Sequence, residues 1–204
     1  MEKIKVLLVD DHPTVRMGIS KLIENQEDIE VCGETGSINK AMTLIEKTKP
    51  DVILVDIAFD NNINGIDLVK TVKERSPKII TIIHSMYEES VYAERAIRAG
   101  ARGYIQKNAK PSMIISAIRN AVKGELILSS KLKDSIINKI LQGNKETTET
   151  DIDILTNREF EIFQLFGKGL SIKEIAERIH LSQHTVETHR RNIKEKLKIT
   201  SNSQ

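Results

Sequence analysis

The sequence predicts an α/β fold, a doubly wound five-stranded parallel sheet, with a second, small all-α domain after it. Three observations support this prediction. Short β-branched apolar runs alternate five times with segments of helical periodicity, which indicates parallel strands joined by helices on both faces. The run "DVILVD" at residues 51–56 is apolar almost throughout, as expected of a strand covered on both faces. Beyond residue 154 the periodicity is purely helical.

The first domain can be followed element by element. The apolar runs predict strands at residues 4–9, 29–33, 52–55, 79–83 and 103–105. The segments between and after them predict helices at residues 13–25, 37–49, 65–75, 88–99 and 111–123. Because crossovers between parallel strands are right-handed, few topologies remain. The flavodoxin-like one, in which the first and third strands are neighbours, is favoured.

A polar segment separates the two predicted domains. Residues 129–142 have the spacing of an amphipathic helix, and the "GNKETTETD" that follows is typical of a flexible tether. "TNRE" and "SIKE" then have the form of capping boxes, and Ser182 offers a third N-cap. These signals predict helices at about 157–168, 172–179 and 183–198. The expected division is a first domain at 1–124, a linker helix and tether at 125–152, and a helical domain at 153–204.

Composition limits the class and the compartment. Hydrophobic residues make up 39% of the chain and charged residues 29%, as in soluble globular proteins. The net charge of +2 indicates no global basic field, and a single cysteine, Cys32, excludes an internal disulfide. No apolar stretch approaches the roughly 18 residues of a membrane span, and the charged N-terminus differs from a signal peptide. We therefore expect a cytoplasmic protein without a membrane partner.

Charged side chains follow several of the predicted strands. Asp10 and Asp11 end the first strand, and Asp56 ends the third, its neighbour. At about 4 Å and an effective dielectric near 20, each pair of like charges costs about 4 kcal/mol. A hard divalent cation such as Mg²⁺ would neutralise the three carboxylates. Acidic residues at strand ends are often only solvated, but Ser85 and Lys107 at two further strand ends favour a functional site.

The last predicted helix is locally basic. Residues 182–199 carry five basic and two acidic side chains, a net charge of +3. Such a run is usually a solvated helix face. The tight "HLS" connection and the apolar residues around it favour instead a helix-turn-helix whose second helix enters the DNA major groove. His184 and His189 are expected to pack or to contact phosphate rather than to bind metal, since no carboxylate or cysteine partner is suitably spaced.

Five segments resemble a known family. "VLLVDDHPTVRMGI", "DVILVDI", "IIHSMYEE" and "GARGYIQKNA" resemble the receiver domain of a bacterial response regulator. "LTNREFEIFQLFGKGLSIKEIAERIHLSQHTVETHRRNIKEKLKI" resembles the LuxR-type helix-turn-helix of the NarL/FixJ subfamily. The resemblance implies a transcription regulator of a two-component system, not an enzyme in its own right. Its implied partners are a sensor histidine kinase, double-stranded DNA and, when phosphorylated, a second copy of the chain.

The resemblance also implies roles for single residues. Asp56 would accept the phosphoryl group, and Mg²⁺ would be held by Asp11, Asp56 and the carbonyl of Ala58, with Asp10 acting through water. Lys107 would pair with the phosphoryl oxygens. The switch residues would be Ser85, which donates to the phosphoryl group, and Tyr104, which changes rotamer. In the second domain, base edges would be faced by Glu187, Thr188 and Arg191, and phosphates by Thr185, Arg190 and Lys194.

The loop after the phosphoacceptor departs from the family pattern. In "DIAFDNNING", Asp60 stands where the family has Pro, and Gly65 comes one position late, so the loop is longer and more acidic. Asp60, Asn62 and Asn64 also match the first half of an EF-hand loop. Thr71, however, stands where that loop needs a bidentate Glu, so calcium binding is not expected. The chain ends at "ITSNSQ", where the family continues into a fourth helix, which leaves dimerisation through this domain open.

Two other functions are compatible with parts of the pattern. In the first, the altered loop makes the receiver only a dimerisation module of a phosphorylation-independent DNA-binding regulator. In the second, the chain is an aspartate-nucleophile phosphohydrolase. Such an enzyme needs a second Asp two residues after the nucleophile, and Ala58 at that position disfavours it.

Overall fold

The structure is a computed structural model that describes residues 2–59, 65–134, 154–179 and 181–199. The chain divides into two compact units, residues 1–137 and 138–204, and each is described by itself. The predicted tether lies outside the described residues, as does the predicted linker helix beyond residue 134, although residues 130–134 are helical. The domain boundaries expected from the sequence stay predictions.

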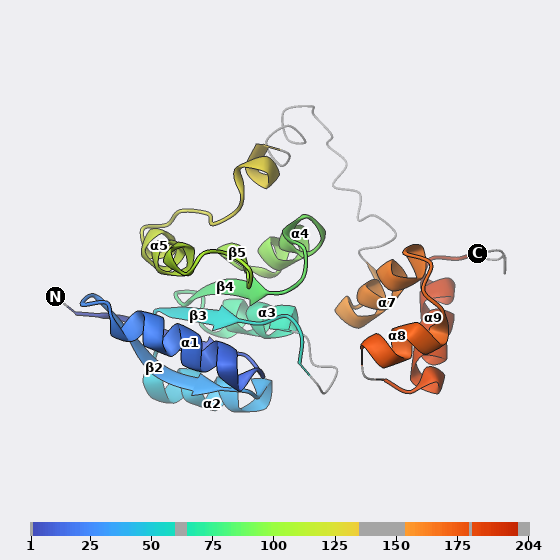
Figure 1. Ribbon diagram of the computed structural model, residues 1–204, viewed down its shortest axis with the longest axis horizontal. Helices are drawn as coiled ribbons and strands as arrows, with labels where there is room; N and C mark the ends of the chain where they lie inside the picture. Colours follow the sequence, from blue (N-terminus) through green and yellow to red (C-terminus); the bar gives the residue numbers. More distant parts are fainter. Residues whose placement is uncertain (1, 60–64, 135–153, 180, 200–204) are drawn as a thin grey trace. The chain divides into compact units, whose positions relative to one another are not determined.

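The first unit is the predicted α/β fold. Its strands pair in the order β2-β1-β3-β4-β5, and every pairing is parallel, which confirms the flavodoxin-like topology. The strands are β1 (Ile4–Val9), β2 (Ile29–Thr35), β3 (Val52–Val55), β4 (Ile80–Ser85) and β5 (Gly103–Gln106). Helices cover both faces of the sheet (Figure 1). They are α1 (Pro13–Glu24), α2 (Ile38–Thr48), α3 (Gly65–Arg75), α4 (Glu89–Ala99) and α5 (Pro111–Val122).

The central strands are buried on both faces. In β1, Val6 to Val9 are each at most 1% exposed, which is the burial that a continuous apolar run in a parallel strand requires. One face packs Val6 and Leu8 against α1 and α5 through Ile23 and Ile118. At about 25 cal/mol per Å² of apolar area, this burial is the main stabilising term of the unit. The sheet therefore holds the residues that follow its strands in fixed places.

Three strands end later than their apolar runs predicted, β5 by the single residue Gln106. β4 continues through His84 and Ser85 because these residues pair with Ile105 and Gln106 of β5. β2 likewise continues to Thr35, opposite Val9 of β1. Polar side chains at the strand ends conceal this pairing in the sequence. Ser85 is consequently the last residue of a strand, and it is 1% exposed.

The second unit is helical, as predicted. Its helices are α7 (Asn157–Gly167), α8 (Ile172–Arg178) and α9 (Gln183–Lys196). Both predicted capping boxes are formed, at Thr156 with Glu159 and at Ser171 with Glu174, and the Ser182 hydroxyl accepts from the N–H of Thr185. Their core contains Leu155, Ile162, Leu165, Ile175, Ala176, Val186 and Ile193.

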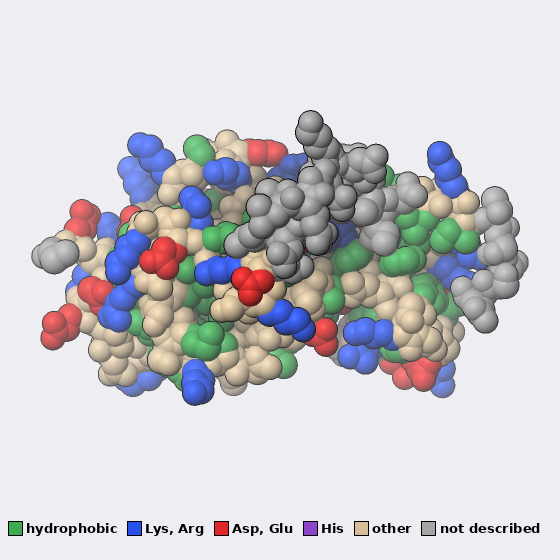
Figure 2. Space-filling view, turned by 90° about the horizontal axis from the view of Figure 1, so that it is seen from above, with side chains coloured by type: hydrophobic (Ala, Val, Ile, Leu, Met, Phe, Trp, Pro, Cys, Tyr) green, Lys and Arg blue, Asp and Glu red, His purple; other side chains and the backbone are tan. Residues whose placement is uncertain are grey.

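Surface charge agrees with the small net charge of the chain. Figure 2 shows Lys and Arg side chains interspersed with Asp and Glu on one face of the first unit. No helix among the described residues combines the length and apolar character needed to cross a bilayer.

Candidate functional site

Two carboxylates lie side by side at the carboxyl edge of the sheet. β1 and β3 are paired with Val9 opposite Val55, so Asp10 and Asp56 leave the sheet at the same level. The N–H of Asp56 donates to the carbonyl of Val9 at 2.9 Å, which fixes this alignment. Asp10 is 4% exposed and Asp56 3% exposed. The parallel register thus creates the charge concentration that the sequence predicted.

Lys107 bridges these two carboxylates. It follows β5 directly, and its Nζ lies 2.8 Å from Asp10 Oδ2 and 2.6 Å from Asp56 Oδ2. Burial raises the pKa of the Asp56 carboxyl, although Lys107 partly offsets the effect. Burial alone would lower the pKa of Lys107, but the attraction of Asp56 and Asp10 outweighs it and holds that pKa above its ordinary value. Asp56 and Lys107, which lie 51 residues apart in the sequence at the ends of two strands, are therefore in direct contact.

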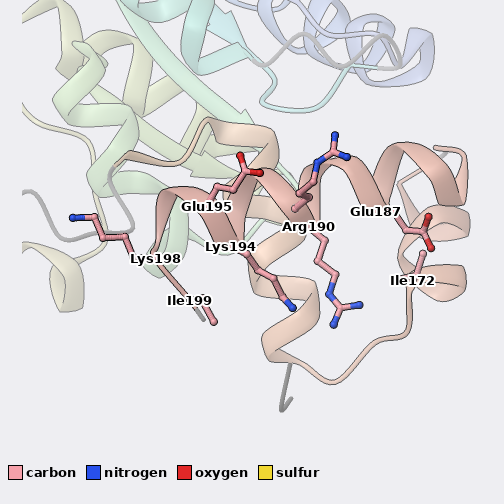
Figure 3. A pocket seen from close by; sticks show the side chains of 8 residues that line it. Ile172, Glu187, Arg190, Lys194, Glu195, Lys198 and Ile199 are labelled. Carbon is pink, nitrogen blue, oxygen red and sulfur yellow. The ribbon is translucent and has the colours of Figure 1, made fainter. Parts of the chain in front are cut away.

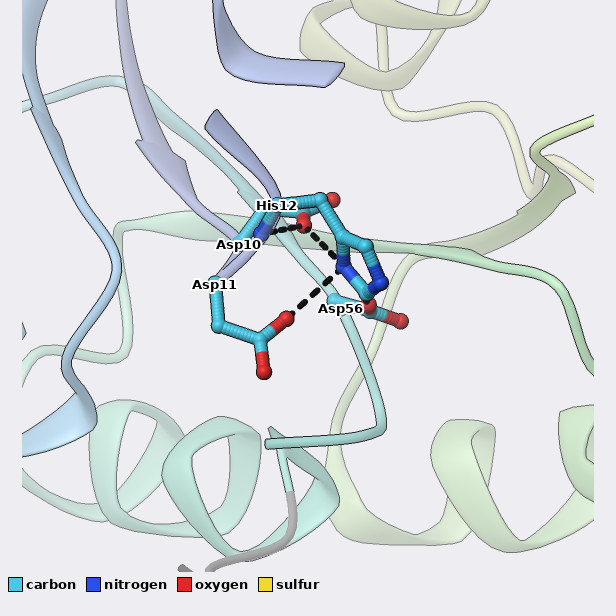
Figure 4. A group of neighbouring side chains, drawn as sticks. All are labelled: Asp10, Asp11, His12 and Asp56. Atoms are coloured by element: carbon cyan, nitrogen blue, oxygen red, sulfur yellow. Dashed lines mark hydrogen bonds and ion pairs between the residues drawn. The ribbon is translucent and has the colours of Figure 1, made fainter. Parts of the chain in front are cut away.

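A third carboxylate and an imidazole complete the cluster. His12 Nδ1 lies 2.8 Å from Asp11 Oδ1, 3.0 Å from Asp10 Oδ1 and 3.7 Å from Asp56 Oδ2. Figure 4 shows the ring of His12 facing the carboxylates. One donor atom from each of Asp10, Asp11, His12 and Asp56 lies within 4.8 Å of the others. Carboxylate oxygens at such spacing, two of them from the buried Asp10 and Asp56, fit a hard divalent cation.

The chain returns to the end of β3 at Gly65. Its N–H donates to the carbonyl of Ile57 at 2.9 Å. A Cβ at this position would collide with the carbonyl oxygen of Asp56, so no larger residue fits without moving the backbone. Ala58 lies on the described start of the loop, and the metal-binding role of its carbonyl stays a prediction. Asp60, Asn62 and Asn64 lie outside the described residues; Thr71 lies within α3, where its hydroxyl donates to the Asp67 carbonyl.

Ser85 and Tyr104 belong to one hydrogen-bonded group beside the cluster. The carbonyl of Ser85 accepts from the N–H of Lys107 at 2.8 Å, and its hydroxyl accepts from the N–H of Tyr87 at 3.4 Å. The Tyr104 hydroxyl donates to the Tyr87 carbonyl at 3.0 Å, as does Gln106 Nε2 at 3.4 Å. Burial raises the pKa of Tyr104 far above its ordinary value. The two predicted switch residues are thus joined through the backbone of Tyr87.

In the second unit, α9 carries the six predicted DNA contacts. A cleft of about 520 Å³ is lined by Ile172, Glu187, Arg190, Arg191, Lys194, Glu195, Lys198 and Ile199. Figure 3 shows Glu187, Arg190 and Lys194 on this helix. The lining contains four basic and two acidic side chains, so the cleft carries a net positive charge. It is the basic helix face that the sequence predicted.

Thr185, Thr188 and Arg190, three of the predicted contacts, each contact a neighbouring residue of the unit. The Thr185 hydroxyl lies 2.7 Å from that of Ser182, at the helix N-terminus. The Thr188 hydroxyl donates to the His184 carbonyl at 3.0 Å. Arg190 lies over the Phe166 ring, 5.6 Å from its centroid. Arg191 and Glu187 are exposed, which the predicted contacts with base edges require.

Two protein families account for the two units. Residues 6–119 match the family described as "Response regulator receiver domain", which covers more than half of the chain. Residues 153–204 match the family described as "Bacterial regulatory proteins, luxR family". The chain belongs to the LuxR-type response regulators.

Relatives of this response regulator span nearly its whole length. It is 33% identical over 201 residues to the "Oxygen regulatory protein NreC" of Staphylococcus haemolyticus, covering 97% of this chain and 93% of the relative. The NreC of Staphylococcus aureus is 34% identical with the same coverage. Both domains therefore align with those of the relatives in a single alignment.

Solved structures agree with this assignment. A LuxR-family response regulator from Aurantimonas is 28% identical with a TM-score of 0.62, over 69% of this chain and 99% of that one. RcsB from Salmonella enterica, solved on a promoter in the presence of phosphomimetic BeF₃⁻, is 25% identical with a TM-score of 0.61. That alignment covers 98% of this response regulator and 95% of RcsB.

The structure adds three residues to which the sequence pattern assigns no role. His12 stands directly after the acidic pair and joins its cluster. Arg16 Nη1 donates to the Asp10 carbonyl at 2.6 Å and so braces the turn between β1 and α1. His84 is 4% exposed, and burial, reinforced by the charge of Lys107, lowers its pKa to about 4. Only His12 had a signal in the sequence, its position beside two carboxylates.

Proposed function

We propose that this protein is a phosphorylation-controlled DNA-binding transcription regulator of a bacterial two-component system, and that Asp56 receives the phosphoryl group from a sensor histidine kinase. The observation that supports it best is the cluster at the carboxyl edge of the sheet. There, the buried Asp56 carboxylate contacts Lys107 at 2.6 Å and lies beside the acidic pair. Because its second partner is chromosomal DNA, the proposed site of action is the cytoplasm.

In the proposed reaction, an oxygen of Asp56 attacks the phosphorus of a phosphohistidine on the kinase. A P–O bond forms as the P–N bond breaks, and the imidazole leaves with the electron pair. Positioning and charge neutralisation provide most of the catalysis in such transfers. A bound Mg²⁺ would supply electrostatic stabilisation of the phosphoryl oxygens, held by Asp11 and Asp56, with Asp10 acting through water. Lys107 pairs with the same oxygens as a point charge.

The proposed switch begins at Ser85. A phosphoryl group on Asp56 adds acceptor oxygens that the Ser85 hydroxyl and Lys107 can engage. The Ser85 hydroxyl accepts from the N–H of Tyr87, so its movement shifts the loop before α4 and the acceptor of Tyr104. Charge-assisted hydrogen bonds contribute about 1.5–3 kcal/mol each. Two of them approach the roughly 5.5 kcal/mol that moves a two-state equilibrium from 1% to 99% active.

The proposed output is DNA binding through α9, with phosphorylation promoting a homodimer. Six positions on one helix supply the contacts, and the basic cleft beside them supplies the attraction to phosphates. The test measures the affinity of the full chain for its operator, selected from random DNA, before and after treatment with a small phosphodonor and Mg²⁺. A rise in affinity that accompanies phosphate incorporation supports the proposal. Affinity that is the same with and without phosphate supports the phosphorylation-independent alternative instead.

Arg191 and Lys194 are expected to contribute to DNA binding in different ways, Arg191 to sequence specificity and Lys194 to affinity for any sequence. Arg191→Ala is expected to cost about 1–3 kcal/mol of specific binding and to relax the preference at one base position. Lys194→Ala should weaken binding to all sequences alike and reduce the salt dependence by about one phosphate contact. The measurement compares both variants on operator and random DNA across a salt series. Equal losses on both DNAs for Arg191→Ala would remove its base-reading role.

A further inference from the structure

We propose that residues 125–129 form a strap, which fastens the start of the linker to the receiver and which phosphorylation releases at Glu89. The strap contacts residues of the hydrogen-bonded group that joins Ser85 to Tyr104 or lies close to them. The inference deepens the proposed function and rests on it, because it names the contact through which that switch reaches the chain beyond α5.

The end of α5 turns the chain back along the sheet. Gly124 has a φ of 90°, a left-handed conformation that glycine adopts without strain, and its N–H donates to the Ala121 carbonyl at 3.0 Å. The N–H of Glu125 donates to the Asn120 carbonyl, also at 3.0 Å. Figure 1 shows the segment after α5 passing β5 on its way toward α4. The strap therefore begins at a turn that favours glycine.

The strap covers an edge of the sheet. β5 is the last strand in the sheet order, so its outer backbone groups have no partner strand. The N–H of Tyr104 donates to the Ile127 carbonyl at 2.8 Å, and the N–H of Ile127 donates to the Arg102 carbonyl at 3.0 Å. These bonds form a parallel bridge between Gly103 and Ile127. A Cβ on Gly103 would collide with Ile127, so this close approach requires glycine.

The middle and the far end of the strap are held differently. Ile127 packs against the core that the sheet shares with α1 and α5, and Leu128 is buried. At the far end a side chain holds the backbone, since the N–H of Ser129 donates to Glu89 Oε1 at 2.8 Å. That hydrogen bond is exposed to solvent. The Glu89 end can therefore open while the middle of the strap stays paired with β5.

Glu89 fixes the point where the next helical segment begins. The Ser129 hydroxyl accepts from the N–H of Leu132 at 3.3 Å, and the Ser129 carbonyl accepts from the N–H of Lys133 at 3.0 Å. Ser129 thus caps residues 130–134, the described start of the linker helix. Loss of the Glu89 contact frees this cap residue, and with it the direction in which the chain leaves the receiver.

The switch residues lie next to both attachments of the strap. The Tyr104 hydroxyl donates to the Tyr87 carbonyl, while the N–H of Tyr104 donates to the strap. Tyr87 precedes Glu89 by two residues, and α4 begins at Glu89. In the proposed switch, the Ser85 hydroxyl turns toward the phosphoryl group and no longer accepts from the N–H of Tyr87. The loop before α4 then shifts, and Glu89 moves away from the strap.

The test combines residue-resolved hydrogen exchange with operator affinity, measured on the full chain with and without a small phosphodonor and Mg²⁺. The variant is Glu89→Ala, which removes the acceptor and keeps a strong helix former at the start of α4. The control is Glu88→Ala, which removes a neighbouring exposed carboxylate that makes no capping hydrogen bond. The β1 amides report whether the rest of the receiver keeps its stability.

Without phosphate, the Ser129 amide should be protected in wild type and in Glu88→Ala. Phosphorylation of either should raise its exchange rate at least about tenfold, the effect of losing one hydrogen bond to a charged group. Glu89→Ala should show the raised rate without phosphate, and its operator affinity should approach that of phosphorylated wild type. Equal exchange in unphosphorylated Glu89→Ala and wild type would overturn the inference. So would a released strap in Glu89→Ala that leaves its operator affinity at the unphosphorylated wild-type level.

Failure of this inference can be told from failure of the proposed function. Phosphate incorporation by the wild-type chain, and its gain in operator affinity, test the proposed function without any strap variant. If wild type takes phosphate and gains affinity while the Ser129 amide stays protected, only the strap is wrong. If wild type takes no phosphate, the proposed function is wrong, and the inference falls with it.

Discussion

Asp56→Asn should incorporate no phosphate when the full chain is incubated with a small phosphodonor and Mg²⁺. The amide lacks the carboxylate oxygen that attacks phosphorus, so the loss should be complete and not partial. Acid-stable, base-labile phosphate, or the mass of the intact chain, provides the measurement. Asp51→Asn is a matched control, because Asp51 is exposed and stands at the other end of β3. Incorporation at the wild-type level by Asp56→Asn would show that the nucleophile is misassigned.

The same variant has a second, independent consequence for stability. Burial raises the pKa of the Asp56 carboxyl in the folded chain. A group with a raised folded-state pKa favours the fold at low pH, and this contribution is lost as the pH rises through that pKa. An Asn does not ionise, and Lys107 keeps Asp10 as its partner at 2.8 Å, so Asp56→Asn should be at least as stable as wild type at neutral pH. The difference in unfolding free energy between Asp56→Asn and wild type should become smaller as the pH falls. Thermal unfolding of both proteins between about pH 4 and pH 7 measures this difference.

Lys107→Ala should destabilise the metal-free receiver by about 3–5 kcal/mol, the usual effect of removing one partner from a buried ion pair. It leaves the carboxylates of Asp10 and Asp56, both at most 4% exposed, without the ammonium that lies within 2.8 Å of each. Mg²⁺ should restore part of the loss, because it neutralises the same oxygens. Hydrogen exchange of the β1 and β3 amides in the full chain measures the change in the receiver alone.

The pH dependence of this stabilisation has a defined sign. The carboxylates of Asp56 and Asp10 hold the pKa of Lys107 above its ordinary value. The stabilisation of the folded receiver by Lys107 is therefore complete at a pH below the ordinary lysine pKa, and it is lost as the pH rises through the raised one. Wild type should therefore lose more stability above about pH 10 than Lys107→Ala does. Lys110→Ala, which removes an exposed lysine three residues later, is the control. Equal stability of the two variants in metal-free buffer would contradict the bridging role.

Much of the fold followed from local patterns in the sequence. Continuous apolar runs predicted β1 and β3 because strands buried on both faces need them, and the parallel topology then brought Asp10, Asp56 and Lys107 together. The end of β4 was concealed, since His84 and Ser85 are polar and yet pair with β5. A strand held by backbone hydrogen bonds needs no apolar side chain at its last positions.

Other features of the site depend on geometry that periodicity does not encode. The place of His12 depends on the turn that Asp10 closes by accepting the N–H of His12. The hydrogen bonds that join Ser85 to Tyr104 run through the backbone N–H and carbonyl of Tyr87, which almost any residue type would supply. Such contacts leave no mark on residue spacing. They follow only from the arrangement of the folded chain.

The coupling of phosphorylation to DNA binding is tested most directly by Ser85→Ala. The variant should take phosphate on Asp56 nearly as wild type does, because the nucleophile and Lys107 remain, but it lacks the hydroxyl that accepts from the N–H of Tyr87. The measurement is the operator affinity of phosphorylated Ser85→Ala beside that of phosphorylated wild type, each relative to its unphosphorylated form. Wild type should gain affinity on phosphorylation, and Ser85→Ala should gain little. A full gain in affinity by Ser85→Ala would contradict the proposed switch.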